Sequence, residues 1–234
     1  MKSWQTKSGY QIVQVLSNRS NSYLISANQI NILVDSGKLK VYNRLRKNIN
    51  SLSSEKQRID YLFLTHTHYD HCQNAQRLKQ EKHCKIIVGS GEAAFCNTGY
   101  TPVPNGTFMF TRFMVAVGKK YLKHRLSYTP FEVDIAINRS FDFINHGLNI
   151  EIISSPGHSA GSACIIVDNE IALVGDTLFG IFPRSVFPPF ADDLSEMVKS
   201  WEKLLQTDCR IFLPGHGNPI SRELLQKEFI KYSN

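Results

Sequence analysis

The sequence lacks several features that would indicate a membrane or an oxidising compartment. No apolar run approaches the roughly 18 residues that a membrane-spanning helix needs. The first ten residues contain no apolar core of a secretory signal. The five cysteines form no Cys-x-x-Cys pair, and their odd number argues against a disulfide framework. We therefore expect a cytoplasmic protein without a membrane span.

Internal repeats, low-complexity tracts and linkers rich in glycine, serine or proline are also missing. The chain has 234 residues, of which 42% are apolar and 20% are charged, as is typical of a globular protein. This length is sufficient for one α/β domain with a sizeable core. We expect a single domain over residues 1–234, with a helical insertion at about 97–130.

Short apolar runs bounded by Asn, Gly, Asp or Ser predict strands, and they alternate with helical patterns. The predicted strands are Tyr10–Leu16, Ser22–Ser26, Ile32–Asp35, Tyr61–Thr65, Lys85–Val88, Ile150–Ser154, Ala163–Val167, Ile171–Val174 and Ile211–Leu213. Helices are predicted from about Cys72 to Gln80, after Asp192 and at about 220–232. Two β-sheets stacked face to face, with helices outside, would bury these apolar runs.

The segment at 97–130 interrupts this alternation and carries charge of one sign. Between Thr98 and Phe131 no residue is acidic and five are basic: Arg112, Lys119, Lys120, Lys123 and Arg125. They contribute to a net charge of +7, which favours an anionic partner unless they only form a solvated helix face. Apolar residues from Phe110 to Tyr121 fit a helical stripe, so a helix at 107–124 is a candidate lid, homodimer contact or surface-binding helix, with an ordinary packed helix as the alternative.

The strongest indication of chemistry is the segment Thr65-His66-Thr67-His68-Tyr69-Asp70-His71, which directly follows an apolar strand. In an extended chain, alternate side chains share a face, so His66 and His68 can bind one ion. Where the chain turns into the next helix, Asp70 and His71 can reach a second position. Imidazole and carboxylate ligands without thiolate suit zinc, iron or manganese.

Three further residues of ligand type each follow an apolar strand and are flanked by glycine. They are His158 in Pro-Gly-His, Asp176 in Gly-Asp-Thr and His216 in Pro-Gly-His-Gly. Loops at one end of a rigid sheet commonly carry functional residues. The histidines without such a setting are expected to be ordinary surface residues: His83, His124 and His146.

These motifs, in this order, resemble those of the metallo-β-lactamase superfamily. The resemblance spans nearly the whole chain and runs through ILVDSG at residues 32–37, HTHYDH, PGHSAGS, GDTLF and LPGHG. It implies an α/β fold, a four-layer αβ/βα sandwich of two stacked mixed β-sheets with outer helices and with metals at one edge. It also implies a metal-dependent hydrolase.

The resemblance assigns two divalent metal ions, with zinc expected and iron or manganese as alternatives. Carried over residue by residue, the ligands are His66, His68 and His158 for the first metal, Asp70, His71 and His216 for the second, and Asp176 as a bridge. Asp35 matches an aspartate that supports the histidine-rich loop. Two metals sharing a hydroxide would supply a nucleophile at neutral pH, and Asp70 is the predicted catalytic residue that steers or receives a proton.

Departures from particular subfamilies narrow the function that the resemblance implies. Asp176 occupies a position where true β-lactamases have Cys or Ser, so β-lactamase activity is not expected. Only 18 residues, 217–234, follow His216, whereas glyoxalase II has a long C-terminal helical domain there. No signature of the tRNA-processing RNase Z group is found. The leading hypothesis is a dinuclear-metal hydrolase of a small ester, thioester or lactone.

A segment rich in phenylalanine and proline, 178–190, directly follows Asp176 and is expected to form an apolar pocket wall. Arg184 is its only charged residue and is the candidate contact for a carboxylate or phosphate of a small-molecule substrate. The alternative is that these phenylalanines belong to the core and that Arg184 is simply exposed to solvent.

Two other enzyme classes on the same scaffold remain as alternatives. Persulfide dioxygenases of this superfamily bind a single iron at positions matching His66, His158 and Asp176, and they also contain the HxHxDH pattern. A metal-dependent phosphodiesterase or nuclease would suit the net charge of +7, and its binding to nucleic acid would weaken steeply with salt. A non-catalytic binding module is disfavoured because the full set of ligands is present.

Overall fold

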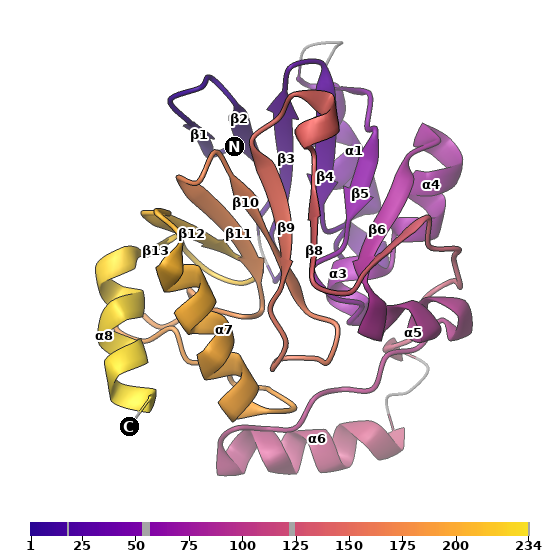
Figure 1. Cartoon of the computed structure of the whole chain (residues 1–234). Coiled ribbons are helices and arrows are strands. Elements are labelled where there is room, and N and C mark those ends of the chain that lie inside the picture. Colours follow the sequence, from indigo (N-terminus) through magenta and orange to yellow (C-terminus); the bar gives the residue numbers. More distant parts are fainter. Residues whose placement is uncertain (18, 53–56, 122–124, 234) are drawn as a thin grey trace.

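Two mixed β-sheets stack face to face and helices cover their outer faces, as Figure 1 shows. The computed structural model describes residues 1–17, 19–52, 57–121 and 125–233, and for 117–121 only the backbone. The expected αβ/βα sandwich is confirmed by this four-layer arrangement.

The first sheet contains seven strands that lie side by side in chain order. They are β1 (Ser3–Gln5), β2 (Gln11–Leu16), β3 (Ser22–Ala27), β4 (Ile30–Val34), β5 (Tyr61–Phe63), β6 (Lys85–Gly89) and β7 (Ile135–Ile137). The first four strands pair antiparallel, and β4 to β7 pair parallel. Its outer face is covered by α1 (Tyr42–Asn50), α4 (Ala75–Lys82) and α5 (Ala93–Thr98).

The second sheet has six strands in the order β13-β12-β11-β10-β9-β8. They are β8 (Ser140–Asp142), β9 (Ile150–Ser154), β10 (Ala163–Val167), β11 (Ile171–Gly175), β12 (Ile211–Pro214) and β13 (Ile220–Ser221). Only β11 and β12 pair parallel. Helices α7 (Leu194–Gln206) and α8 (Arg222–Tyr232) cover its outer face.

Both faces of each sheet are buried, which explains why the strands read as continuous apolar runs. In β3, Tyr23 and Ile25 point into the core between the sheets, whereas Leu24 packs under the helices. On the other side, Trp201 of α7 is fully buried and its indole N–H donates to the carbonyl of Thr177, at 2.7 Å. This contact fixes α7 against the chain just after Asp176.

The largest difference from the prediction lies in the histidine-rich segment. The single helix predicted from about Cys72 to Gln80 is two helices, α3 (Tyr69–Cys72) and α4, so helix formation begins directly after His68. Likewise β5 ends at Phe63 rather than Thr65, because the chain leaves the sheet before the first histidine. Asp70 and His71 therefore project from a helical turn.

Several elements were not predicted from the sequence. Helix α1 buries Tyr42, Leu45 and Ile49 at helical spacing, so its pattern was present and was overlooked. Strands β1, β7, β8 and β13 have two or three residues each, which is too short for an alternating pattern to be recognised.

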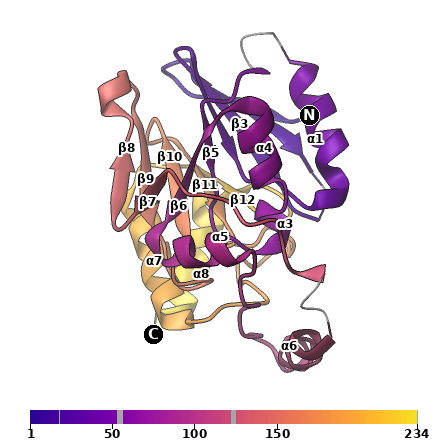
Figure 2. The ribbon, with the colours of Figure 1, turned by 90° about the vertical axis from the view of Figure 1, so that its right-hand side faces the viewer.

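The helix predicted within the 107–124 segment is α6 (Met109–Tyr121), and it lies apart from the sandwich in Figures 1 and 2. His124 and Lys123 lie outside the described residues, as do the side chains of Lys119 and Lys120. His83 and His146 are exposed, as expected. No helix in the described ranges combines the length and apolarity needed to cross a membrane.

Candidate metal centre

All seven predicted ligands converge at one end of the two sheets, although they come from four separate segments. His66 and His68 lie between β5 and α3, with Asp70 and His71 in α3; His158 follows β9, Asp176 follows β11, and His216 follows β12. Six of the seven are buried, and Asp70 is half-buried. The seven residues that were grouped from the sequence therefore also lie together in the structure.

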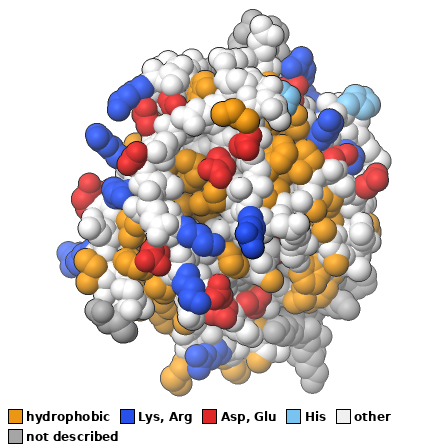
Figure 3. Space-filling model, viewed as in Figure 1, with side chains coloured by type: hydrophobic (Ala, Val, Ile, Leu, Met, Phe, Trp, Pro, Cys, Tyr) orange, Lys and Arg blue, Asp and Glu red, His pale blue; other side chains and the backbone are white. Residues whose placement is uncertain are grey.

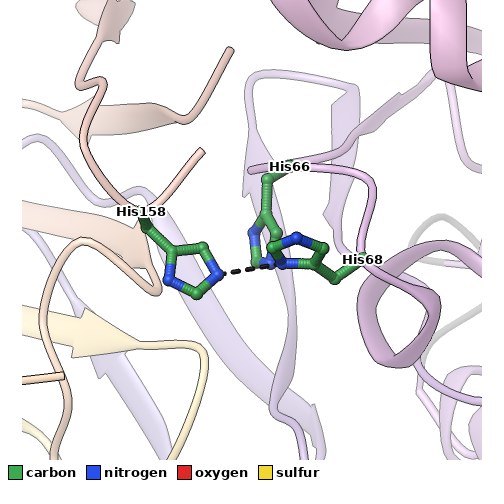
Figure 4. A group of neighbouring side chains, drawn as sticks. All are labelled: His66, His68 and His158. Carbon is green, nitrogen blue, oxygen red and sulfur yellow. Dashed lines mark hydrogen bonds between the residues drawn. The ribbon is translucent and has the colours of Figure 1, made fainter. Parts of the chain in front are cut away.

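The ligand atoms form three overlapping groups in which all atoms lie within 4.8 Å of one another. The groups are His66 with His68 and His158, His66 with His71 and Asp176, and Asp70 with His71 and His216. Figure 4 shows the first of them, with two imidazoles from one loop facing the imidazole of His158 from the opposite segment.

Asp176 lies at the centre of these groups. Its Oδ2 is 3.3 Å from His216 Nε2 and 3.6 Å from His158 Nε2. The same oxygen is 4.0 Å from His66 Nε2, and Oδ1 is 3.4 Å from His71 Nε2. This carboxylate thus faces histidines proposed for the first metal and histidines proposed for the second. It has the position required of a bridging ligand.

Each imidazole is oriented by a partner on its other ring nitrogen. His66 Nδ1 faces Thr65 Oγ1 at 3.1 Å, and His71 Nδ1 faces Asp35 Oδ2 at 2.8 Å. Backbone carbonyls face the remaining three: Pro102 O for His68 Nε2, Phe190 O for His158 Nδ1 and Arg19 O for His216 Nδ1. The rings are therefore fixed with one nitrogen directed into the site.

The donor set fits a divalent cation. A carbonyl oxygen only accepts, so His68 Nε2 and His158 Nδ1 must donate, and each ring directs a lone pair into the site. The two nitrogens that carry these lone pairs, His68 Nδ1 and His158 Nε2, are 2.9 Å apart, and burial lowers the pKa of both histidines to about 4. Two neutral nitrogens this close repel each other unless a cation lies between them.

Two further atoms support this fit. Within the described part of the chain, the buried His66 Nε2 and Asp176 Oδ1 make no hydrogen bond. Buried polar atoms are normally paired, so unpaired ones need a ligand or a functional reason. Both atoms face the same cluster of imidazoles.

The charged side chains of the centre shift one another's pKa values. Burial alone would raise the pKa of Asp176, but His216 and His71 hold it well below its usual value. Burial would likewise lower the pKa of His71, whereas the charges of Asp176 and Asp35 raise it to about 10. The centre therefore contains an ionised carboxylate, and its negative charge favours positively charged groups or cations beside it.

Asp35 supports the histidine-rich loop, in the position that the resemblance implied. It is 2% exposed and has a positive φ of 60°, at the end of β4. Its Oδ1 accepts from the backbone N–H of Thr65 at 2.9 Å, while Oδ2 faces His71. One carboxylate thus ties the start of the loop to a ligand in α3.

Two further residues contact the centre or its loops, and neither contact was predicted from the sequence. The Glu92 carboxylate is fully buried and contacts both the histidine-rich loop and the loop of His158. The ring of Phe179 stacks on His216, with centroids 4.9 Å apart and an interplanar angle of 19°. Phe179 was expected only as part of a wall, and nothing in the sequence around Glu92 indicated a contact with either loop.

The 178–190 segment divides between core and surface. Leu178, Phe179 and Val186 are buried, whereas Ile181 and Phe182 are exposed. Arg184 is exposed, and in the described part of the chain it makes no hydrogen bond or ion pair. Leu178 and Val186 belong to the core under α7 and α8, as the alternative interpretation expected of the phenylalanines, whereas Phe179 contacts His216 and the Arg184 side chain is accessible.

Known proteins are similar to this chain in sequence over most of its length. The sequence model of the metallo-beta-lactamase superfamily matches residues 18–216. A beta-lactamase-like protein 2 homolog of Drosophila melanogaster is 25% identical over 214 residues, which is 90% of this chain and 62% of that protein. An atrochrysone carboxyl ACP thioesterase of Aspergillus fumigatus is 28% identical over 200 residues, 85% of this chain and 50% of that enzyme. This chain thus spans half to two thirds of those two relatives.

A probable metallo-hydrolase of Methanocaldococcus jannaschii is 29% identical over 201 residues, with 85% of this chain and 87% of that protein covered. Among solved structures, a superfamily protein of Sulfolobus tokodaii aligns with a TM-score of 0.65 and 19% identity, over 94% of this chain and 85% of that one. A subclass B3 metallo-beta-lactamase of Bradyrhizobium japonicum aligns with a TM-score of 0.68 and 16% identity, over 100% of this chain and 91% of that one. The structural likeness concerns the fold, and the family match over residues 18–216 shows that this chain belongs to the metallo-beta-lactamase superfamily.

Proposed function

We propose that the chain is a dinuclear-metal hydrolase, with zinc as the expected metal, that cleaves a small ester, thioester or lactone. The observation that carries the proposal is the set of seven ligands arranged in overlapping groups around Asp176. The relatives named as a thioesterase and as a probable metallo-hydrolase agree with this class of reaction. A site for a single iron would leave the group of Asp70, His71 and His216 without a role.

Two divalent cations in this site would supply an activated water as nucleophile and a Lewis acid for the scissile group. The chain itself orients the ligands through Asp35 and through the carbonyls that face His68 and His158. Asp70 is the most exposed of the seven proposed ligands, at 15% side-chain exposure, and lies next to His216, whose side chain is 10% exposed. It can therefore accept a proton in the site and release it to water.

The test is the metal content of protein purified without added metal, followed by assays with ester, thioester, lactone and phosphodiester substrates. About two zinc or manganese ions per chain, with turnover of a carbonyl substrate, is the expected result. About one iron per chain with oxygen consumption on persulfides would replace the proposal by a dioxygenase. Failure to bind metal after reconstitution would reject both.

Arg184 is the proposed contact for an anionic group of the substrate, since it is exposed, has no ion pair among the described residues, and belongs to the segment whose Phe179 stacks on His216. Arg184→Ala should raise KM for an anionic ester roughly tenfold, with kcat little changed, because charge-assisted pairs to Arg contribute on the order of 1.5–3 kcal/mol. A neutral ester of the same size is the control and should respond equally in both proteins. An unchanged KM for the anionic ester would remove Arg184 from the substrate site.

We also propose that α6 forms a homodimer contact. Large apolar side chains project from its first turns: Met109 is 88% exposed, Phe110 71% and Phe113 69%. The space-filling view in Figure 3 shows hydrophobic side chains at the lower end of the molecule, where α6 lies in Figure 1. Several large apolar side chains exposed on one helix are more typical of an interaction site than of a surface that faces water.

Sedimentation analysis should therefore find a dimer that Phe110→Ser combined with Phe113→Ser converts to a monomer. Ile144→Ser, which changes an apolar side chain that is 70% exposed elsewhere, is the matched control and should leave the dimer intact. A wild-type protein that is monomeric at all concentrations would contradict the assignment.

A further inference from the structure

Glu92 is a fully buried carboxylate that does not belong to the ligand set but contacts two of its loops. It lies in the turn Ser90–Glu92 that follows β6. Its Oε2 accepts from the backbone N–H of Thr67 at 3.0 Å and from the Thr67 hydroxyl. Its Oε1 accepts from Ser159 Oγ at 2.6 Å and from the backbone N–H of Gly161 at 3.1 Å.

The partners of Glu92 are the immediate neighbours of three ligands. Thr67 lies between His66 and His68, and Ser159 directly follows His158. The first two ligands follow a strand of the first sheet, and the third follows a strand of the second sheet. This ligand group is thus assembled across the sandwich, and Glu92 joins its two halves.

Glycines allow the two segments to approach closely enough for one side chain to reach both. A Cβ at Gly89 would lie 2.0 Å from the carbonyl oxygen of Gly161, and a Cβ at Gly161 would lie 2.6 Å from the backbone nitrogen of Glu92. Neither distance is compatible with a side chain. The close approach is therefore built into the backbone, with Glu92 at the crossing point.

We propose that Glu92 is a positioning residue for the first metal position, formed by His66, His68 and His158. It holds the two ligand-bearing loops at the separation that lets their imidazoles share one ion. The second position, formed by Asp70, His71 and His216, has its own support from Asp35 and the carbonyl of Arg19. The inference rests on the proposed metal centre and adds that the separation of the two loops at the first position depends on Glu92, whereas Asp35 contacts His71 of the second position and Thr65 beside His66.

The hydrogen-bond chemistry requires a carboxylate at residue 92. Its four partners all act as donors, and two of them are backbone N–H groups that cannot accept. In Glu92→Gln, one oxygen becomes an NH₂ group that faces at least one such N–H, while Glu92→Ala leaves all four donors without a partner. Both changes should separate the loops.

The experiment measures metal affinity by titration of metal-free protein with Zn²⁺ against a chromophoric chelator, and with Co²⁺ by visible absorption. His158→Ala, which removes a ligand of the first position, identifies the signal of that position. Glu92→Gln should weaken the first position by about 10–100-fold, as expected for an outer-shell partner, and leave the second within about threefold. Ser159→Ala, which removes one donor and keeps the carboxylate, should weaken the first position less.

Glu228→Gln is the matched control, because Glu228 is also buried, at 3% exposure, but bonds to Ser185 and not to either loop. It should lower thermal stability without changing either affinity. Suppose that the wild-type protein binds two ions. If Glu92→Gln then binds both ions as tightly as the wild type, or loses both equally, the inference about Glu92 is wrong, but the proposed metal centre is not affected. If Glu92→Gln does not fold, unchanged first-position affinity in Ser159→Ala overturns it. If wild-type protein binds no metal, the proposed function fails instead.

Discussion

Asp176→Ala should lose both metals and reduce hydrolysis by on the order of 10³-fold or more. Its carboxylate lies within 4.0 Å of the site-facing nitrogens of four histidines that belong to both metal groups. Outer-shell partners already cost about 10–100-fold in metal affinity or activity, and a ligand shared by two metals should cost more. The loss of its negative charge would also remove the carboxylate that offsets the positive charge of the two ions in a buried site.

Metal content by elemental analysis and initial rates on the best substrate would measure this effect. Asp168→Ala is the control, since Asp168 lies in the turn between β10 and β11, at the other end of the strand that leads to Asp176. It should keep two metals and near-normal turnover. Retention of two metals in Asp176→Ala would show that Asp176 is not a bridging ligand.

Asp70→Ala should have the second largest effect, and it should be selective. Asp70 belongs to the group with His71 and His216, and its Oδ2 is 3.8 Å from His216 Nε2. The variant should keep about one metal per chain, because the ligands of the first position are unchanged and only the second position loses a ligand. Turnover should fall by about 10²–10⁴-fold, since a positioned acid or base commonly contributes this much.

Tyr69→Phe is the adjacent control. The hydroxyl of Tyr69 bonds to Lys38 Nζ at 3.0 Å, and Tyr69 belongs to none of the ligand groups. Its removal should preserve the metal content. Wild-type turnover in Asp70→Ala would eliminate both the ligand role and the proton-transfer role of this residue.

The two effects together separate the functions of the two carboxylates. Loss of both metals in one variant and of a single metal in the other would match a bridging Asp176 and a terminal Asp70. Equal losses in both variants would mean that the two positions depend on each other. In that case the selective effect expected for Glu92→Gln would fail as well.

The sequence by itself determined which residues could be ligands. HxHxDH places four donors within six residues, so their proximity follows from local chain geometry alone. The apolar runs that precede His158, Asp176 and His216 predicted strands, and the family resemblance implied that these strands end at one edge. All seven proposed ligands could therefore be predicted from the sequence together with its family resemblance.

Only the tertiary structure decided how these residues are held. His71 and His216 are 145 positions apart, yet their Nε2 atoms lie 3.2 Å apart because two stacked sheets end at one edge. The carbonyls of Pro102 and Phe190 orient two imidazoles, and a backbone carbonyl has no signature in a sequence. Glu92 was missed for a related reason: its partners are two backbone N–H groups and two hydroxyls from distant loops, and only the packing of the sheets brings them together.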